Sequence, residues 1–463
     1  MSHPRHDPSG QPDDRLARFA RALGRVIPDA MSTCIAMMVL VVAVALALGN
    51  SIATIGDAYY RGLWMLISFT MQMTLILVLS STLGAAPEFK RVVARIAKIP
   101  RSEAQVFVGA ILLTASFSYL YWGLGLALGP LVAIYFAREA ERAGIMVDFP
   151  FLLAVTAAAT SVWQYGLSAS APLLMNTPGH FLEKTTGLMP LQTTIWAPSS
   201  LIFIAVFLVA LMIAARLLKP ARPQPISDFP ESSKLAEPST IGMAEPVTQP
   251  VASAEPYSER LERNSIPTLV LVAALVGWLY YHFGVKALGL DLNSLNTVLL
   301  LLTLLVHRNV RNFSRALQSA IVSCWPVVVL YHLYAGVAGL IQFTSVGEQF
   351  ANGFAAISTQ YTFPLLTALA STVVAIFVPS SGGQWVIQGF VTAKAAEAVG
   401  LTVQRGLLAL QVGDQMGNLI SPFWAVITGG MARIDFRRFI GYTVAFSAIW
   451  FVLGVLVFTF LPA

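Results

Sequence analysis

The sequence predicts an all-α polytopic membrane protein with about nine transmembrane helices and two re-entrant hairpins, arranged as two inverted repeats. The 463 residues are 56% hydrophobic and 11% charged, whereas a soluble domain carries roughly 25% charged residues. Two apolar stretches, 104–137 and 362–393, are too long for one crossing and are broken near the middle by Gly, Ser and Trp. Irregular backbone at membrane depth needs protein cover or a water-filled cavity beside it. Paired breaks in two halves therefore indicate the binding site of a secondary transporter.

Charge and cysteine usage exclude several other classes. The net charge of +6 lies mostly in short loops beside apolar segments, so it orients the chain in the bilayer and predicts no nucleic-acid partner. Cys34 and Cys324 lie inside apolar segments and form no disulfide or metal pattern. Residues 1–27 are polar and rich in arginine. We expect them to form a cytoplasmic N-terminal tail, part of it an amphipathic helix on the membrane surface.

Segments of about 20 apolar residues mark the simple crossings. They fall at 28–50, 62–84, 194–216, 266–283, 293–307, 316–342 and 439–460. Residues 217–265 contain eight prolines together with Ser, Glu and Ala, a composition that cannot bury a core. We therefore expect a disordered cytoplasmic linker between a first repeat at 28–216 and a second half at 266–463.

Basic loops give each half its orientation. Arg and Lys gather at 85–103 and 138–148 in the first half, and at 307–315 and 433–438 in the second. If all four loops are cytoplasmic, hairpin 104–137 enters from the cytoplasm, and hairpin 362–393 enters from the opposite side with its tip at 379–385. The C-terminus is then periplasmic.

Each half would then run crossing, crossing, hairpin, interrupted crossing, crossing. Segments 149–175 and 404–430 are the interrupted crossings. Segment 266–283 is the extra crossing that permits the inversion.

The second hairpin tip carries the strongest local signal for binding. Its glycines let backbone approach a ligand closely, and its serines and the N-terminus of the following half-helix suit an anion. The candidate substrate-binding residues there are Ser380, Ser381, Gly382, Gly383, Gln384 and Trp385. The alternative is a structural break packed against neighbouring helices.

The first tip and the first interrupted crossing supply further candidates. Trp122 and Gly123 stand at the tip of hairpin 104–137, and Gln164, Ser168 and Ser170 lie in an uncharged stretch after it. Close helix packing through small residues is the alternative for this group. Trp122 and Trp385 are candidates for contact with an apolar tail.

Asp414 is the candidate for binding a coupling ion, with Asn418 and Ser421 nearby; Asn418 is also a substrate candidate. A carboxylate at membrane depth costs about 2.5–3.5 kcal/mol on insertion scales, so function or a structural hydrogen bond must justify it. No Lys or Arg adjoins either tip. Neutral donors and a co-bound H⁺ or Na⁺ would then hold an anion, which favours symport. We expect no other cofactor.

One long motif resembles a known family. The sequence Val378-Pro-Ser-Ser-Gly-Gly-Gln-Trp-Val-Ile-Gln-Gly389 is similar to the signature of bacterial short-chain fatty acid transporters of the acetoacetate/butyrate type, within the broader ion-transporter group. Further similar segments follow in family order: Ile27-Pro-Asp29, Phe69-Thr-Met-Gln-Met73, Trp122-Gly-Leu-Gly125, Pro172-Leu-Leu174, Thr177-Pro-Gly179 and Pro422-Phe-Trp424. The resemblance implies transport of short monocarboxylates across the inner membrane, by a mobile domain that carries the hairpins and moves against a scaffold.

The chain departs from that pattern at functional positions. Ser381 stands where relatives typically have Gly, Gln384 where they have His, and Asp414 where they have Glu, while 163–166 is richer in Gly in relatives. Loss of a titratable donor at Gln384 leaves substrate identity and proton coupling open.

Three other functions stay open at this point: a transporter of dicarboxylates or other organic anions, a membrane-embedded enzyme, and a passive channel. The protein would work in the bilayer as a monomer or a homo-oligomer.

Overall fold

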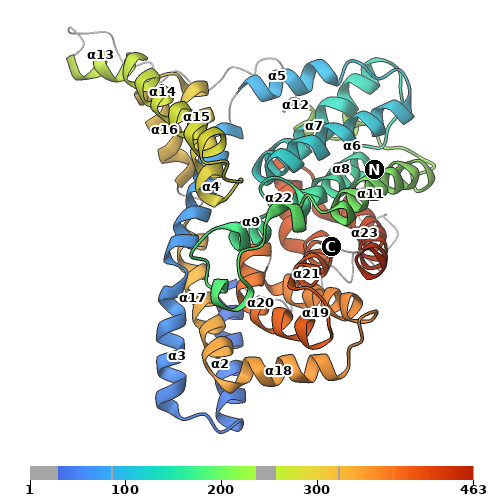
Figure 1. Cartoon of the computed structure of the whole chain (residues 1–463). Coiled ribbons are helices and arrows are strands. Elements are labelled where there is room, and N and C mark those ends of the chain that lie inside the picture. Colours follow the sequence, from blue (N-terminus) through green and yellow to red (C-terminus); the bar gives the residue numbers. More distant parts are fainter. Residues whose placement is uncertain (1–29, 85–86, 236–256, 322–323, 379, 462–463) are drawn as a thin grey trace, which may run out of the picture.

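The computed structural model describes residues 30–84, 87–235, 257–321, 324–378 and 380–461, and within these ranges the only regular secondary structure is helical (Figure 1). Six helices in these ranges are long and apolar enough to cross a membrane, and the bent pair α17–α18 makes a seventh. Three shorter apolar helices add to them: Met31–Ala47, Leu292–His307 and Phe363–Phe377. The predicted class, an all-helical polytopic membrane protein, is confirmed. The N-terminal tail 1–27 lies outside the described residues.

The helices follow the predicted order with shifted boundaries. The first half contains α2 (Ala30–Ala47), α3 (Ile52–Met65), α4 (Ile67–Gly84), α5 (Pro87–Ile96), α6 (Glu103–Leu120), α7 (Trp122–Arg142), α8 (Phe149–Ala159), η1 (Thr160–Tyr165), α9 (Ser170–Asn176), α10 (Glu183–Thr186), η2 (Leu191–Thr193) and α11 (Pro198–Leu217). The crossing predicted at 62–84 begins earlier, because α3 and α4 together form one apolar span from Ile52 to Gly84.

The segment after α11 and the second half complete the chain. They contain η3 (Ile226–Asp228), α12 (Pro230–Lys234), α13 (Tyr257–Arg263), α14 (Ile266–Tyr280), η5 (Tyr281–Val285), α15 (Leu292–His307), α16 (Val310–Ile321), α17 (Trp325–Phe343), α18 (Ser345–Ala356), α19 (Phe363–Phe377), α20 (Ser381–Ala398), α21 (Val403–Ile420), α22 (Pro422–Ala432), η7 (Phe436–Arg438) and α23 (Ile440–Phe460). The crossing predicted at 316–342 contains the end of α16 and most of α17, and residues 322–323 between them lie outside the described ranges. The bend between α17 and α18 is 74°.

The helices form two groups that lie side by side (Figure 1). In the first, α17 packs on α2, α3 and α4, and α4 packs on α15 and α16. The second contains both predicted hairpins, the interrupted segments, α11 and α23, with α19 against α21 as its most extensive contact. The groups meet where α4 touches α7 and where α17 touches α20.

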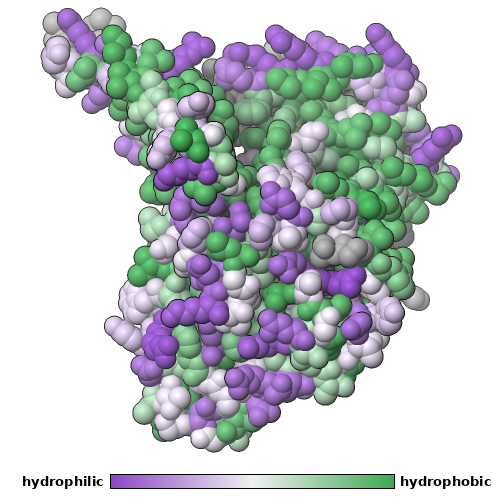
Figure 2. Space-filling model, in the orientation of Figure 1, coloured by the Kyte–Doolittle hydropathy of each residue, from purple (hydrophilic) through white to green (hydrophobic). Residues whose placement is uncertain are grey.

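Small residues allow the backbones of the first group to approach closely. A Cβ added at Gly62 of α3 would lie 2.6 Å from the Cα of Gly339 in α17, so only glycine permits this crossing. On the outside, large apolar side chains of α14 such as Leu269 and Val270 are exposed. Figure 2 shows hydrophobic surface over this helix region. Such a surface is stable against lipid rather than water.

Contacts along α6 and α7 define the first hairpin as an antiparallel pair. A Cβ at Gly125 would lie 2.7 Å from the Cβ of Ser118, and a Cβ at Gly109 would lie 2.8 Å from the Phe136 ring. Residue numbers thus rise along α6 while they fall along the facing side of α7, as in an antiparallel pair. The chain turns at Tyr121, which is extended, one residue before the predicted tip. Each arm has 18 or more residues, so the re-entrant depth and the inverted orientation of the halves stay predictions.

The second hairpin joins α19 and α20 more loosely. The Gln384 amide of α20 donates to the Ser371 carbonyl of α19 at 2.8 Å, while α19 packs chiefly along α21. The break is shorter than predicted, because 381–385 already form the first turns of α20. Pro379 itself lies outside the described residues.

The prediction of a disordered linker is wrong for residues 218–235. The backbone N–H of Gln224 donates to Asp148 Oδ2 at 2.9 Å, and the Gln224 carbonyl accepts from the Phe149 N–H at 2.9 Å. Ile226 and Ser232 are buried. These docking contacts with the ends of α7 and α8 stabilise a segment whose composition alone cannot form a core. Residues 257–263 are helical as α13, and 236–256 lie outside the described residues.

Candidate functional site

One short segment connects both hairpin tips. After α8 the chain makes the 3₁₀ turn η1, continues without regular structure and enters α9 at Ser170. The Trp122 N–H, at the start of α7, donates to Ser168 Oγ at 2.8 Å. The Gly382 N–H, at the start of α20, donates to Ser170 Oγ at 2.9 Å. The first N–H groups of a helix have no partner inside it, so two serine hydroxyls satisfy one such group at each tip.

A glycine makes this connection possible. A Cβ at Gly166 would lie 2.5 Å from the Tyr119 carbonyl oxygen, and the neighbouring Leu167 N–H donates to that same oxygen at 2.7 Å. The unwound segment is therefore held against the end of α6 by its backbone. The predicted interruption of 149–175 is confirmed, and it lies between the two tips.

The second tip carries hydroxyl groups that face the cavity. Ser380 is the N-cap of α20, and its Oγ accepts from the Gly383 N–H at 3.3 Å and lies 2.8 Å from Tyr331 Oη. The next residue, Ser381, is buried, and its Oγ has no hydrogen-bond partner. A Cβ at Gly382 would lie 2.8 Å from the Phe69 ring. Two serine hydroxyls thus lie at the start of α20, where the glycine leaves room for the Phe69 ring.

A buried carboxylate joins the two interrupted crossings. Asp414 of α21 is fully buried; its Oδ2 accepts from the Gln164 amide of η1 and from Asn418 Nδ2 at 3.2 Å. Its Oδ1 has no partner. The Gln411 amide, one turn earlier on α21, donates to the Gln164 carbonyl, and Gln411 Oε1 is also unpartnered. Two buried oxygens on adjacent turns of α21 therefore lack donors.

The indole of Trp163 is fixed by the same pair of elements. Its Nε1 donates to Gln415 Oε1 at 3.0 Å, and the Gln415 amide donates to Ser161 Oγ at 2.9 Å. Trp424 of α22 donates to Asn418 Oδ1 at 3.2 Å. Two tryptophans are thus oriented by amide side chains of α21, whose break at Ser421 confirms the predicted interruption of 404–430.

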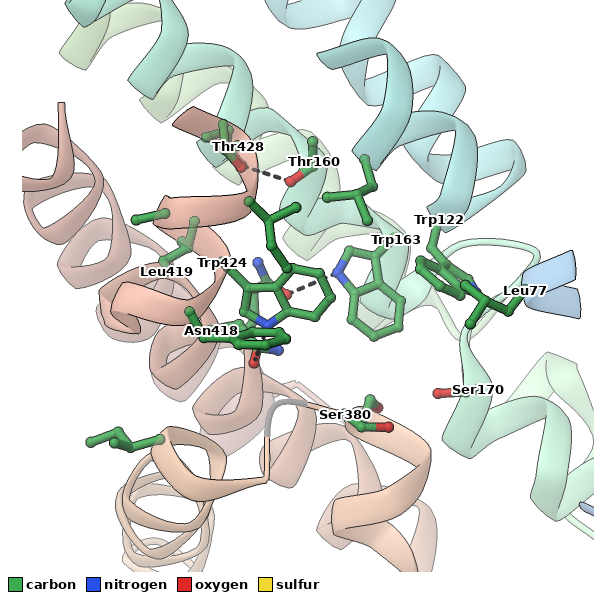
Figure 3. Close-up of a pocket in the computed structure, with 18 of the residues that line it drawn as sticks. Leu77, Trp122, Thr160, Trp163, Ser170, Ser380, Asn418, Leu419, Trp424 and Thr428 are labelled. Carbon is green, nitrogen blue, oxygen red and sulfur yellow. Dashed lines mark hydrogen bonds between the residues drawn. The ribbon is translucent and has the colours of Figure 1, made fainter. Parts of the chain in front are cut away.

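A cavity of about 640 Å³ lies between the two helix groups (Figure 3). The side facing the first group is lined by α2, α4 and α17, and the other sides by α7, η1, α19–α23 and neighbouring residues. Five predicted site residues line it: Trp122, Ser170, Ser380, Ser381 and Asn418. None of the lining residues, all within the described ranges, is charged.

The other predicted residues lie beside the cavity or face away from it. Gln384 is fully buried and donates to Ser371 and to Gln388 Oε1, so its amide holds the hairpin arms together. Trp385 is fully buried against Gly389. The remaining predicted residues make close backbone approaches or hydrogen bonds to other parts of the protein and do not line the cavity: Gly123, Gln164, Ser168, Gly382, Gly383, Asp414 and Ser421.

Sequence reasoning did not select several lining residues. Tyr331, Trp163, Trp424 and Gln415 all line the cavity. Gln415 was detectable, because Gln415-Met-Gly417 repeats the pattern Gln164-Tyr-Gly166. Trp424 stands in the family-like segment Pro422-Phe-Trp424, but its residue type alone does not mark a cavity wall, since tryptophan and tyrosine are also common at membrane interfaces.

Comparisons with known proteins decide the family. The family model for the short chain fatty acid transporter matches residues 14–461. The chain belongs to the short-chain fatty acid transporter family. A protein from Escherichia coli (strain K12) that carries a provisional name as a short-chain fatty acid transporter is 28% identical over 452 residues, covering 96% of this chain and 99% of the relative. A similarly named protein from Haemophilus influenzae (strain ATCC 51907 / DSM 11121 / KW20 / Rd) is 25% identical over 453 residues, covering 95% and 99%.

A solved structure shows the same fold. The crystal structure of the Alcanivorax borkumensis YdaH transporter, described as having an unusual topology, superposes with a TM-score of 0.60 at 15% identity. The match covers 94% of this chain and 98% of that one. At this identity the likeness concerns architecture alone. This chain thus shares a whole-chain fold with YdaH.

Proposed function

We propose that this short-chain fatty acid transporter is a secondary active transporter that moves short-chain monocarboxylates across the bacterial inner membrane together with H⁺ or Na⁺. The observation that carries the proposal is the uncharged cavity at the tip of α20, where Ser381 Oγ is buried without a partner. A single carboxylate would accept hydrogen bonds from Ser380, Ser381 and Tyr331 there. The positive end of the α20 dipole adds favourable electrostatics.

The lack of a fixed cation favours a singly charged substrate and a co-bound ion. The described lining residues include neither Lys nor Arg, so a second carboxylate would have no ionic partner. An anion entering a neutral site is stabilised when a cation binds nearby, because the net charge taken into low dielectric falls. This supports symport and weighs against dicarboxylates.

Asp414 is the proposed coupling residue. Its Oδ2 is fixed by Gln164 and Asn418, whereas its Oδ1 has no donor. A buried carboxylate oxygen without a donor costs free energy unless a proton or metal ion occupies it. Either ion at Oδ1 would also stabilise the contact between η1 and α21. Those elements contact the cavity through Trp163 and Asn418, so ion binding and substrate binding would be coupled.

The arrangement in two helix groups supports a proposal for alternating access. We propose that the group with the hairpins moves against the α2–α4 and α17 scaffold, in the elevator-like manner that the family resemblance implies. The N-terminus would be cytoplasmic and the C-terminus periplasmic. The protein would act as a monomer or a homo-oligomer.

Uptake by proteoliposomes tests this function. Labelled acetate, butyrate and acetoacetate are offered with Na⁺ and pH gradients imposed separately. We expect accumulation above equilibrium with one gradient, and its loss in Asp414→Asn. The matched control is Asp57→Asn, because Asp57 is an exposed residue of α3 paired with Arg61. Normal gradient-driven accumulation by Asp414→Asn would refute the coupling assignment.

The same experiment separates the other functions. A membrane-embedded enzyme would return chemically altered label, whereas a transporter returns it unchanged. A passive channel would equilibrate the label without concentrating it. Strong competition by succinate would favour the dicarboxylate alternative.

A further inference from the structure

The cavity extends well beyond the carboxylate-binding end. Figure 3 shows Ser380 and Ser170 at one end, Trp163 and Trp424 in the middle, and Thr160 and Thr428 at the other end. A carboxylate bound by Ser380 and Ser381 would therefore direct its hydrocarbon tail along the tryptophans. The size and polarity of this space therefore determine which hydrocarbon tails the site can bind.

Aromatic side chains wall the middle of the cavity. Trp163 is held by Gln415 and Trp424 by Asn418, as described above. Trp122 lies beside Trp163 with ring centroids 6.4 Å apart. Hydrogen bonding of an indole N–H leaves its faces free for apolar contact, and fixed rings lose little entropy when a ligand packs on them. The walls are therefore suited to an apolar or aromatic group.

The far end is apolar in character although it contains threonines. Of the two threonines there, Thr160 uses its hydroxyl within the protein, because its Oγ1 donates to the Ala157 carbonyl of α8 at 2.7 Å. The Thr160 hydroxyl therefore offers no free donor to a ligand, which leaves the hydroxyl of Thr428 as a polar group at this end. Ala157 and Ile427 also line this region.

The volume exceeds what the smallest substrates need. Pockets of about 300–1,000 Å³ bury ligands of drug size, and this cavity of about 640 Å³ falls within that range. Acetate would occupy only the serine end and leave the tryptophan walls in contact with water or unfilled space. Apolar surface of this extent is stabilised when a ligand removes it from water.

We propose that the site prefers monocarboxylates with a long or bulky apolar tail, such as hexanoate, octanoate or phenylpropionate, over acetate and butyrate. This proposal rests on the transport function proposed above. Each methylene that enters the apolar region should tighten binding about fourfold, so octanoate should bind about 200-fold more tightly than butyrate. A second carboxylate on the tail would abolish the gain, because the far end has no basic residue among the described lining residues.

Competition against labelled butyrate uptake tests the preference. The inhibitors are the straight-chain acids from acetate to octanoate, phenylpropionate, and the dicarboxylate suberate. Octan-1-ol is included because it has an octyl chain but no carboxylate, and so reports non-specific effects on the bilayer. We expect the inhibition constant to fall stepwise with chain length up to octanoate, while suberate and octanol inhibit weakly.

Two variants narrow the far end of the cavity from different helices. Ala157→Leu of α8 and Ile427→Phe of α22 should raise the inhibition constant of octanoate at least tenfold more than they raise the KM for butyrate uptake. Ala36→Leu is the matched control, because Ala36 of α2 is exposed and does not line the cavity. A thermal-unfolding midpoint equal to that of the wild type shows that each variant is folded.

The outcomes separate the tail proposal from the proposed function. If no carboxylate of any length is taken up or competes, the transport function itself fails. If butyrate is transported but inhibition does not strengthen with chain length, the tail proposal is overturned. It is also overturned if the narrowing variants slow all substrates equally, because the far end would then be only an access path.

Discussion

The contact between α19 and α21 is closest at Gly413, and replacing this glycine with alanine is the most direct test of the arrangement around the site. A Cβ at Gly413 would lie 1.9 Å from the Ala368 carbonyl oxygen and 2.7 Å from the Ser371 Cβ. Ser371 in turn donates to the Leu410 carbonyl at 2.6 Å and accepts from the Gln384 amide. The substitution therefore strains the contact that holds the second hairpin beside Asp414.

The magnitude follows from the geometry. Ordinary van der Waals contact begins at 3.4 Å, so the two helices must separate by about 1.5 Å (3.4 minus 1.9) to admit the methyl group. Overpacking of this kind typically costs 1–3 kcal/mol, and a backbone carbonyl cannot rotate away as a side chain can. Alanine offsets up to about 1 kcal/mol through its better helix propensity. At the upper end of that range the net destabilisation is about 2 kcal/mol (3 minus 1).

The assay compares two identical substitutions. Thermal unfolding of detergent-solubilised protein should show a clearly lower midpoint for Gly413→Ala, together with loss of butyrate uptake. Gly430→Ala in α22 is the control, because its Cβ would meet nothing within 4 Å. It should match or slightly exceed the wild-type midpoint. A Gly413→Ala protein that melts with the wild type and transports normally would refute the close approach of α19 and α21.

Two further predictions concern the cavity and the docked segment. Tyr331→Phe removes the hydroxyl beside Ser380 but keeps the ring stacked on Phe69, with ring centroids 5.5 Å apart. The KM for carboxylate uptake should rise about fivefold to tenfold, while thermal stability stays unchanged. The control Tyr60→Phe, at an exposed tyrosine, should leave KM unchanged. Asp148→Asn removes the carboxylate oxygen that accepts from Gln224, so trypsin should cleave after Lys234, the one basic residue of 218–235 that no proline follows, faster than in an Asp228→Asn control.

Burial raises the pKa of Asp148 above its ordinary value of 3.8, despite opposing hydrogen bonds from the Gln224 and Phe151 backbone. Its stabilising contribution is therefore full below the unfolded-state pKa and is lost as pH rises through the folded-state pKa. That pH dependence should disappear in Asp148→Asn. An unchanged thermal-stability profile with pH would contradict this explanation.

The sequence was informative about where helices break. Gly, Ser and Pro within an apolar stretch disfavour a continuous helix, and this local property predicted a break near Trp122 and interruptions within 149–175 and 404–430. The absence of charge over long stretches predicted membrane crossings for the same reason. Helix-breaking residues and the absence of charge are properties of short segments and of the solvent around them, so both can be recognised without a tertiary structure.

The sequence was less informative about which side chains face the cavity. Gln384 stands in the most distinctive motif of the chain, yet its amide binds Ser371 inside the hairpin. Trp163 and Trp424 lie in less distinctive surroundings and wall the cavity. A helical turn of 100° per residue separates neighbouring side chains, and only the packing of other helices decides which direction becomes a cavity.

The sequence was also uninformative about the ordered conformation of segment 218–235. Its prolines and polar residues predict no core of its own, and that inference about composition is sound. Its order depends on Asp148 and on the ends of α7 and α8, which lie far away in the chain.

The sequence by itself determined that this chain is a helical membrane protein with broken segments in both halves, because hydrophobic length and helix propensity are properties of neighbouring residues. The tertiary structure alone decided which groups satisfy the backbone freed at those breaks. Ser168 and Ser170 hold the two hairpin tips, and Gln164 binds Asp414 across some 250 residues of chain. Unpaired polar groups are costly in a low-dielectric interior, so these distant partners fix the site, and no local pattern can specify them.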